Sequence, residues 1–155
     1  MSEDKIIEIL RELREDKVFY FLEEEDLALV APFFELVQHP PNTLIFKENE
    51  QGDFICFVLS GKLEVKKQTE FKGNQIILAL LTKGAMVGEL SLFDQSKRSA
   101  TVETAEETTL LILRNSSLDD LIQKHPYIGI KILKGFIRIL SLRLRKATER
   151  LTNIF

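Results

Sequence analysis

The sequence predicts a mainly β fold: a jelly-roll barrel with helices before it and a long helix after it. Hydrophobic residues follow a helical period near the N-terminus, change from residue 43 to short β-branched and aromatic runs, and become helical again near residue 117. Turn-forming residues separate the short runs every eight to twelve residues, which is typical of a sandwich or barrel. We expect a single domain over 1–155, with N-terminal helices over about 1–35, the barrel over 43–114 and C-terminal helices over 116–153.

Two short helices are expected before the barrel. Residues 3–15 carry apolar side chains at helical spacing, and Ser2 precedes them as a cap. A second helix over about 24–31 stops before Pro32. The tract 39–42 ends the helical pattern, because its two consecutive prolines fix the backbone φ angle and remove hydrogen-bond donors.

Six strands are expected in the barrel. Ser60-Gly61 makes a tight connection between two of them, and Lys72-Gly73-Asn74 makes a turn before another. The predicted ranges are 43–46, 54–60, 62–66, 75–81, 101–103 and 108–113.

The C-terminal region predicts a helix from near Ser117 and, beyond Pro126, a long helix over about 127–151. The long helix carries a heptad seam, with apolar residues spaced alternately by three and four. A parallel homodimer through the 130–154 helix is our hypothesis; the alternative is a monomer whose helix folds back. The seam residues are Ile130, Leu133, Ile137, Leu140, Leu144, Ala147, Leu151 and Ile154.

Composition and charge narrow the class of protein. Apolar residues make up 45% and charged residues 29%, as in globular proteins. Because no apolar run reaches about 18 residues and no secretory signal precedes the chain, we expect a cytoplasmic protein without a membrane partner. The single cysteine, Cys56, lies in an apolar run and is expected to be buried and inert.

The two ends of the chain have opposite charge. Residues 1–26 hold ten acids and four bases, whereas residues 131–155 hold seven bases and one acid. A basic helix is one sign of nucleic-acid binding. Since the chain as a whole has a net charge of −3, we expect a solvated or internally paired helix face and no nucleic-acid partner.

The segment 88–102 contains the most specific pattern. A glycine ends a strand, Glu89 opens what reads as one helical turn, and a polar loop leads to Arg98 at the start of a new strand. Unpaired N–H groups of a first helical turn favour an anion, and an arginine can bind a phosphate through two parallel N–H bonds. Two interpretations stay open on the residues alone: a phosphate site, or a loop ion pair between Glu89 and Arg98.

This segment resembles the phosphate-binding cassette of the cyclic-nucleotide-binding domain family: Gly-Glu, apolar residues, a loop, then Arg, a small residue, Ala, Thr and Val. Residues 49–53 and 57–65 are similar to the same family, as is the stretch from Pro126 through Leu140. The likeness covers roughly residues 15–150. It implies a β-roll that binds a cyclic nucleotide, like the sensor domain of the catabolite-activator branch without its DNA-binding domain.

By position, the resemblance implies that Arg98 pairs with the cyclic phosphate and that Glu89 binds the ribose 2′-hydroxyl. Asn49 stands where the family usually has a glycine, and asparagine tolerates the positive φ of such a turn. The resemblance implies further phosphate contacts from Gly88, the backbone N–H groups of Leu90 and Ser91, and the hydroxyl of Ser99.

Contacts with the base are less specified. Val65 and Leu78 would form the apolar wall beside a purine, or they are simple core residues. On the long helix, the family's base-capping positions fall on Arg143 and Leu144, and Arg143 either stacks on the purine or is a solvated charge. The base preference is therefore open; cyclic AMP is the first candidate ligand and cyclic GMP the second. No other cofactor is expected.

The expected function is a regulatory module in which the ligand repositions the C-terminal helix to signal to an unknown effector protein. No catalytic or metal-ligating residue is identified, because His39 and His125 flank the barrel and form no cluster with acids. We therefore do not expect an enzyme. The remaining alternative is a structural or dimerisation module that keeps the β-roll without a ligand.

Overall fold

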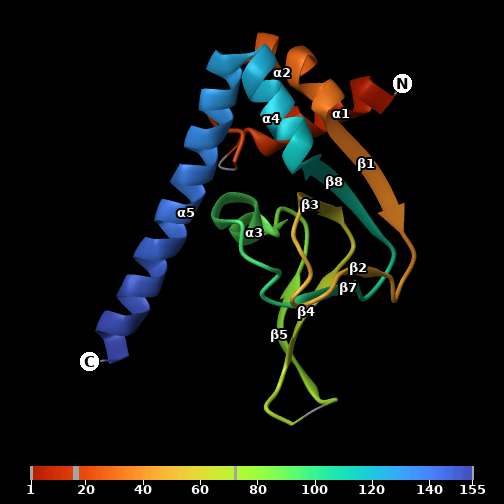
Figure 1. Cartoon of the computed structure of the whole chain (residues 1–155). Helices are drawn as coiled ribbons and strands as arrows, with labels where there is room; N and C mark the ends of the chain where they lie inside the picture. Colours follow the sequence, from red (N-terminus) through yellow and green to blue (C-terminus); the bar gives the residue numbers. More distant parts are fainter. Residues whose placement is uncertain (1, 16–17, 72, 155) are drawn as a thin grey trace. The chain divides into compact units, whose positions relative to one another are not determined.

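The computed structural model describes residues 2–15, 18–71 and 73–154, and Figure 1 labels its elements. By their internal contacts the residues divide into two compact units. We call Phe33–Leu118 the β unit, and Met1–Pro32 with Asp119–Phe155 the helical unit. The expectation of one domain over 1–155 stays a prediction.

The β unit contains two antiparallel sheets of four strands each. One has the order β1-β8-β3-β6 and the other β2-β7-β4-β5. A short helix, α3 (Glu89–Asp94), joins β6 to β7. The two-sheet architecture and the flanking helices confirm the predicted fold class. The strands are β1 (Phe34–His39), β2 (Leu44–Phe46), β3 (Phe54–Ser60), β4 (Leu63–Gln68), β5 (Gln75–Leu81), β6 (Met86–Val87), β7 (Thr101–Thr104) and β8 (Thr108–Arg114).

The six predicted strands are all present, and two further strands were not predicted. β1 lies between a 3-10 turn, Ala31–Phe33, and the consecutive prolines, and it pairs along its whole length with β8, from Phe34↔Leu113 to His39↔Thr108. Such a distant partner leaves no local signal. β6 is two residues long, too short for a period to show. The predicted turn residue Lys72 lies outside the described residues.

The core of the β unit is formed by alternate residues of facing strands. Cys56 and Val58 of β3 are fully buried, as are Leu63 of β4 and Leu110 of β8. Successive residues of a strand point to opposite faces, so Phe57 lies on the other side of β3 from this cluster. Each fully buried aliphatic side chain contributes about 1.5–3 kcal/mol, and the cluster therefore fixes the strands around it.

A β-bulge interrupts the β4–β5 hairpin. Val65 pairs with Ala79, but the next residue, Lys66, pairs with Ile77, which leaves Leu78 without a partner. The extra residue changes which face the following side chains occupy. β5 is an edge strand, and the hairpin extends away from the rest of the β unit in Figure 1.

The helical unit is built on a long C-terminal helix. Pro126 occupies its first position, where the missing N–H removes no hydrogen bond, and it ends the preceding helix as predicted. A Cβ on Gly135 would overlap the backbone oxygen of Val18, so only glycine permits this approach. The helices are α1 (Ser2–Leu13), α2 (Glu24–Val30), α4 (Asn115–Lys124), which begins in the β unit, and α5 (Pro126–Ile154).

The distal part of α5 is exposed on every face from residue 141 to 153. Ile137, Leu144 and Leu151 of the heptad seam are 62%, 68% and 58% exposed, and the side chain of Ile154 lies outside the described residues. None of the helices in the described parts of the chain is both long enough and apolar enough to cross a membrane.

Candidate functional site

The cassette begins at a backbone turn that requires glycine. Gly88 has a φ of +93°, and a Cβ there would lie 2.5 Å from Nη1 of Arg98. The helix α3 follows at once, which confirms the predicted helical turn, and it ends on Gln95, also left-handed at φ +58°. Two left-handed residues thus fold the segment back so that Arg98 lies against its start.

Arg98 is the central side chain of the site. It is 2% exposed, and its guanidinium donates from Nη1 to the Gly88 carbonyl at 3.2 Å and from Nη2 to the Phe54 carbonyl at 2.7 Å. No described residue accepts a hydrogen bond from Nε. Among the described residues no carboxylate pairs with it, and burial lowers the pKa of Arg98 from its ordinary value more than the nearby acids raise it. Arg98 is therefore a buried cation for which the described residues supply no ion-pair partner.

The backbone of Arg98 is fixed as well. Its N–H donates to the Glu50 carbonyl and its carbonyl accepts from the Asn49 N–H, both at 2.8 Å. Asn49 has a φ of +72°, which confirms that asparagine takes the left-handed position at this turn. The loop 47–52 thus fixes the backbone of Arg98 through two hydrogen bonds.

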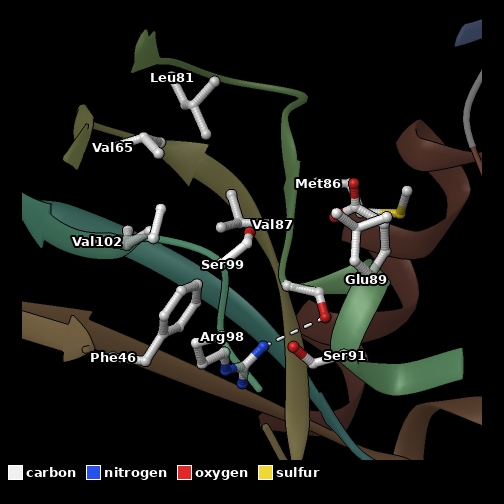
Figure 2. A pocket seen from close by; sticks show the side chains of 13 residues that line it. Phe46, Val65, Leu81, Met86, Val87, Glu89, Ser91, Arg98, Ser99 and Val102 are labelled. Carbon is white, nitrogen blue, oxygen red and sulfur yellow. Dashed lines mark hydrogen bonds between the residues drawn. The ribbon is translucent and has the colours of Figure 1, made fainter. Parts of the chain in front are cut away.

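A pocket opens between the cassette and the β4, β5 and β7 strands (Figure 2). Ser91 on its wall is buried, and Figure 2 shows the Arg98 guanidinium turned toward the start of α3, with a hydrogen bond to the Gly88 carbonyl drawn as a dashed line. The structure therefore brings together most of the predicted site residues. Those that line the pocket are Val65, Gly88, Glu89, Leu90, Ser91, Arg98 and Ser99.

One predicted residue lies outside the pocket lining, and two others belong to the helical unit. Leu78 does not line the pocket: it is 52% exposed at the β5 bulge, and Leu81, opposite Leu63, takes the place on the wall. The resemblance assigned Leu78 to the wall by position, and the bulge, which inserts one residue, changes the face that this side chain occupies. Arg143 and Leu144 belong to α5 in the helical unit, so their role toward a base stays a prediction.

Several lining residues were not predicted from the sequence. Phe46 and Val102 could have been predicted from the strand pattern. Phe46 is the last residue of an apolar strand, Val102 lies at an inward-facing position of its strand, and both belong to the core cluster. Met86 and Ala100 had no periodic signal, because β6 has only two residues and residue 100 precedes β7. Apolar side chains thus form more of the wall than the cassette pattern alone indicates.

No group of three or more His, Cys, Asp or Glu side chains gathers as a metal site among the residues that the structure describes. Cys56 is buried as predicted, and this burial raises the pKa of its thiol to about 12. A thiol held in this protonated form is a poor nucleophile.

Comparison with known proteins gives a consistent result. Residues 36–125 match the family described as Cyclic nucleotide-binding domain. The Cyclic AMP receptor protein of Thermus thermophilus is 32% identical over 130 residues, which is 84% of this chain and 58% of the receptor protein. A cyclic nucleotide-binding domain from Methylobacillus flagellatus superposes with a TM-score of 0.80 at 22% identity, covering 96% of this chain and 85% of that one, a likeness of fold.

Lysophospholipase nte1 of Neurospora crassa is 31% identical over 111 residues, 72% of this chain, but the match spans only 7% of that protein. This chain therefore spans less than two thirds of both curated relatives. The shared part is in each case one segment of a longer protein.

Proposed function

Because the chain belongs to the cyclic nucleotide-binding domain family, we propose that it is a sensor module whose pocket binds a cyclic purine nucleotide, with cyclic AMP as the first candidate. The proposal rests above all on the buried Arg98 guanidinium. A guanidinium has five N–H donors, so three remain after the bonds to the Gly88 and Phe54 carbonyls. A cyclic phosphate diester supplies the missing negative charge and accepts two parallel N–H bonds.

The other lining residues take complementary roles. The carboxylate of Glu89 accepts hydrogen bonds from the ribose 2′-hydroxyl, which selects ribose over deoxyribose. The N–H groups at the start of α3, around Leu90 and Ser91, and the hydroxyl of Ser99 complete the phosphate cradle. Val65, with Leu81 in place of Leu78, provides the apolar wall.

The pocket is small for a whole nucleotide. Its cavity volume is about 160 Å³, against roughly 300 Å³ for the smaller ligand sites of proteins. We infer that it encloses the ribose phosphate and leaves part of the purine outside. Arg143 and Leu144 of α5 are the candidates to cover that part, and a ligand that prefers one position of α5 shifts the helix toward it.

The affinity follows from ligand size. A cyclic mononucleotide with roughly 22 heavy atoms at about −0.3 kcal/mol each gives a Kd near 10 μM.

Thermal unfolding with cyclic AMP, cyclic GMP and linear AMP tests the proposal, because a ligand that binds only the native state raises the Tm of the protein. We expect a rise with a cyclic form and none with AMP. No rise with any of the three would leave the β-roll as a structural module.

We also propose a parallel homodimer through α5, on the exposed seam residues Ile137, Leu144 and Leu151. Residues at the a positions of a heptad pack against a second helix. Sedimentation of Leu144→Glu tests this, with Leu142→Glu as the control, since Leu142 is 44% exposed on another face of α5. We expect the first to be monomeric and the second to remain a dimer; a monomeric wild-type protein at high micromolar concentration contradicts the dimer.

We expect no catalysis from this chain, and a protein partner to receive the signal. The matched segment occurs in a receptor protein and in an enzyme of much greater length, which supports a regulatory role that different outputs share. Cytoplasmic location stays a prediction.

A further inference from the structure

The surroundings of Arg98 have a second feature that hydrogen bonds do not explain. Its guanidinium carbon lies 4.0 Å from the centre of the Phe46 ring and 4.7 Å from the centre of the Phe54 ring. The two rings are themselves 6.1 Å apart at an interplanar angle of 68°. Figure 2 shows the Phe46 ring beside the arginine at the floor of the pocket. The cation is thus in contact with two aromatic rings.

Two glycines bound the same guanidinium on other sides. A Cβ on Gly52 would lie 3.0 Å from Cζ and from Nε of Arg98, and a Cβ on Gly88 would lie 2.5 Å from Nη1. Side chains at either position would displace the guanidinium. The rings of Phe46 and Phe54 and the two glycines therefore define one place for it.

A buried arginine usually has a carboxylate partner, because an unpaired charge is expensive to bury. A carboxylate on Arg98 would compete with the ligand phosphate for the same donors. An aromatic ring attracts the cation through its quadrupole and carries no net charge, so it holds the guanidinium without neutralising it. The Gly88 and Phe54 carbonyls act in the same way.

We propose that Phe46 and Phe54 are positioning residues that hold Arg98 as an oriented, un-neutralised cation before the ligand arrives. This proposal rests on the proposed function of the pocket. Its consequence is for affinity: a guanidinium already fixed loses little conformational freedom on binding a phosphate diester, whereas a mobile one must first be ordered.

The test compares ring removal with ring retention. Phe46→Leu and Phe54→Leu remove one ring each, and Phe54→Tyr keeps the ring. Phe57→Leu removes a buried ring on the face of β3 opposite to Cys56 and Val58. Binding of cyclic AMP is measured by calorimetry. We expect about fivefold to tenfold weaker binding for the two ring-removing variants, and wild-type affinity for Phe54→Tyr and Phe57→Leu.

A spectroscopic measurement on the ligand-free protein separates this proposal from the proposed function. Because a proton over the face of an aromatic ring is shifted upfield, we expect the Arg98 Nε–H proton to resonate upfield of its ordinary position. We expect Phe46→Leu, but not Phe57→Leu, to move it back. Wild-type protein that shows the shifted proton but no cyclic AMP binding contradicts the proposed function alone. Wild-type binding with unchanged affinity in Phe46→Leu and Phe54→Leu contradicts the positioning role alone.

Discussion

Lys131 of the helical unit and Arg98 of the β unit are two cations that the fold holds in defined places, and their charges are satisfied in different ways. In the helical unit, Lys131 of α5 donates to the carboxylate of Asp26 in α2 at 2.8 Å. In the β unit, Arg98 is more deeply buried, yet it donates to carbonyls and has no carboxylate partner among the described residues. Within the part of the chain that the structure describes, a carboxylate pairs with Lys131 and none pairs with Arg98.

The pKa shifts of the two cations follow this difference. The hydrogen bond with Asp26 is the main cause that raises the pKa of Lys131, whereas burial is the main cause that lowers the pKa of Arg98. Both groups stay protonated near neutral pH, but their surroundings favour the charge in one case and oppose it in the other. A neutralised cation stabilises the fold, and an un-neutralised one keeps its charge for a ligand.

Replacing Arg98 gives the largest expected effect. Arg98→Leu leaves the ligand phosphate unpaired, which costs about 3–5 kcal/mol, so cyclic AMP binding becomes undetectable by calorimetry at micromolar concentrations. Stability of the free protein should change little, because the loss of a buried charge offsets the two carbonyls that lose their donor.

Lys131→Met is the matched control for this comparison. It removes the neutralised cation, so we expect the Tm of the free protein to fall while the affinity for cyclic AMP stays at the wild-type value. Undiminished binding by Arg98→Leu would reject the role of the guanidinium.

A smaller effect is expected from the glycine at the start of the cassette. Gly88→Ala places a methyl group 2.5 Å from Nη1 of Arg98, so the guanidinium must move and binding of cyclic AMP should weaken about tenfold. Because Gly88 has a φ of +93°, the alanine should also cost about 1–2 kcal/mol of stability. Gly73→Ala is the control, since Gly73 has a φ of +90° and nothing within 4 Å of the added atom. Calorimetry and urea unfolding should show similar strain in both variants, and equal loss of binding in both would contradict the steric argument.

The sequence was sufficient to predict the elements that have a local signal. The strands over 54–60 and 75–81 match the structure at both ends, since their apolar runs end at turn residues. The helical turn after Gly88 was also predicted from the cassette, and α3 begins there. The roles of those residues toward a ligand remain proposals.

Features that depend on residues distant in the chain could not be predicted from local sequence patterns. β1 is a strand because β8 lies beside it, and Leu78 leaves the pocket because a bulge shifts the register of β5. The contact of Phe46 with Arg98 joins residues 52 positions apart, and no periodicity reports it. Long-range packing, rather than local propensity, decides these positions.

The next prediction concerns the neutralised cation. Asp26→Asn removes the charge that pairs with Lys131 but keeps an oxygen to accept the Glu23 N–H at the start of α2. We expect a loss of about 1 kcal/mol in the free energy of unfolding, measured with urea, because a charge-assisted hydrogen bond becomes a neutral one. Affinity for cyclic AMP should not change; a parallel loss of affinity would show that the ion pair also serves the pocket.

The smallest effect is a difference in pH dependence. Burial opposes ionisation of Asp26, but hydrogen bonds from Lys131 and from the Glu23 N–H outweigh it and hold the pKa of this carboxyl below its ordinary 3.8. A depressed folded-state pKa contributes stability that is present above the unfolded-state pKa and is lost as pH falls through the folded value. The stability difference between wild type and Asp26→Asn should therefore be constant above about pH 5 and shrink below about pH 4.

Arg98 should show no such dependence, since a guanidinium remains protonated throughout this range even with a lowered pKa. Its affinity for a cyclic diester should be flat from about pH 5 to pH 8. Urea midpoints report the stability of the fold and calorimetry reports the affinity for cyclic AMP. Measured on the same samples, they distinguish the two cations, because acid should weaken the Asp26–Lys131 pair before it affects binding at Arg98. A stability difference that persists unchanged at about pH 3 would mean that Asp26 and Lys131 are not coupled as the 2.8 Å contact indicates.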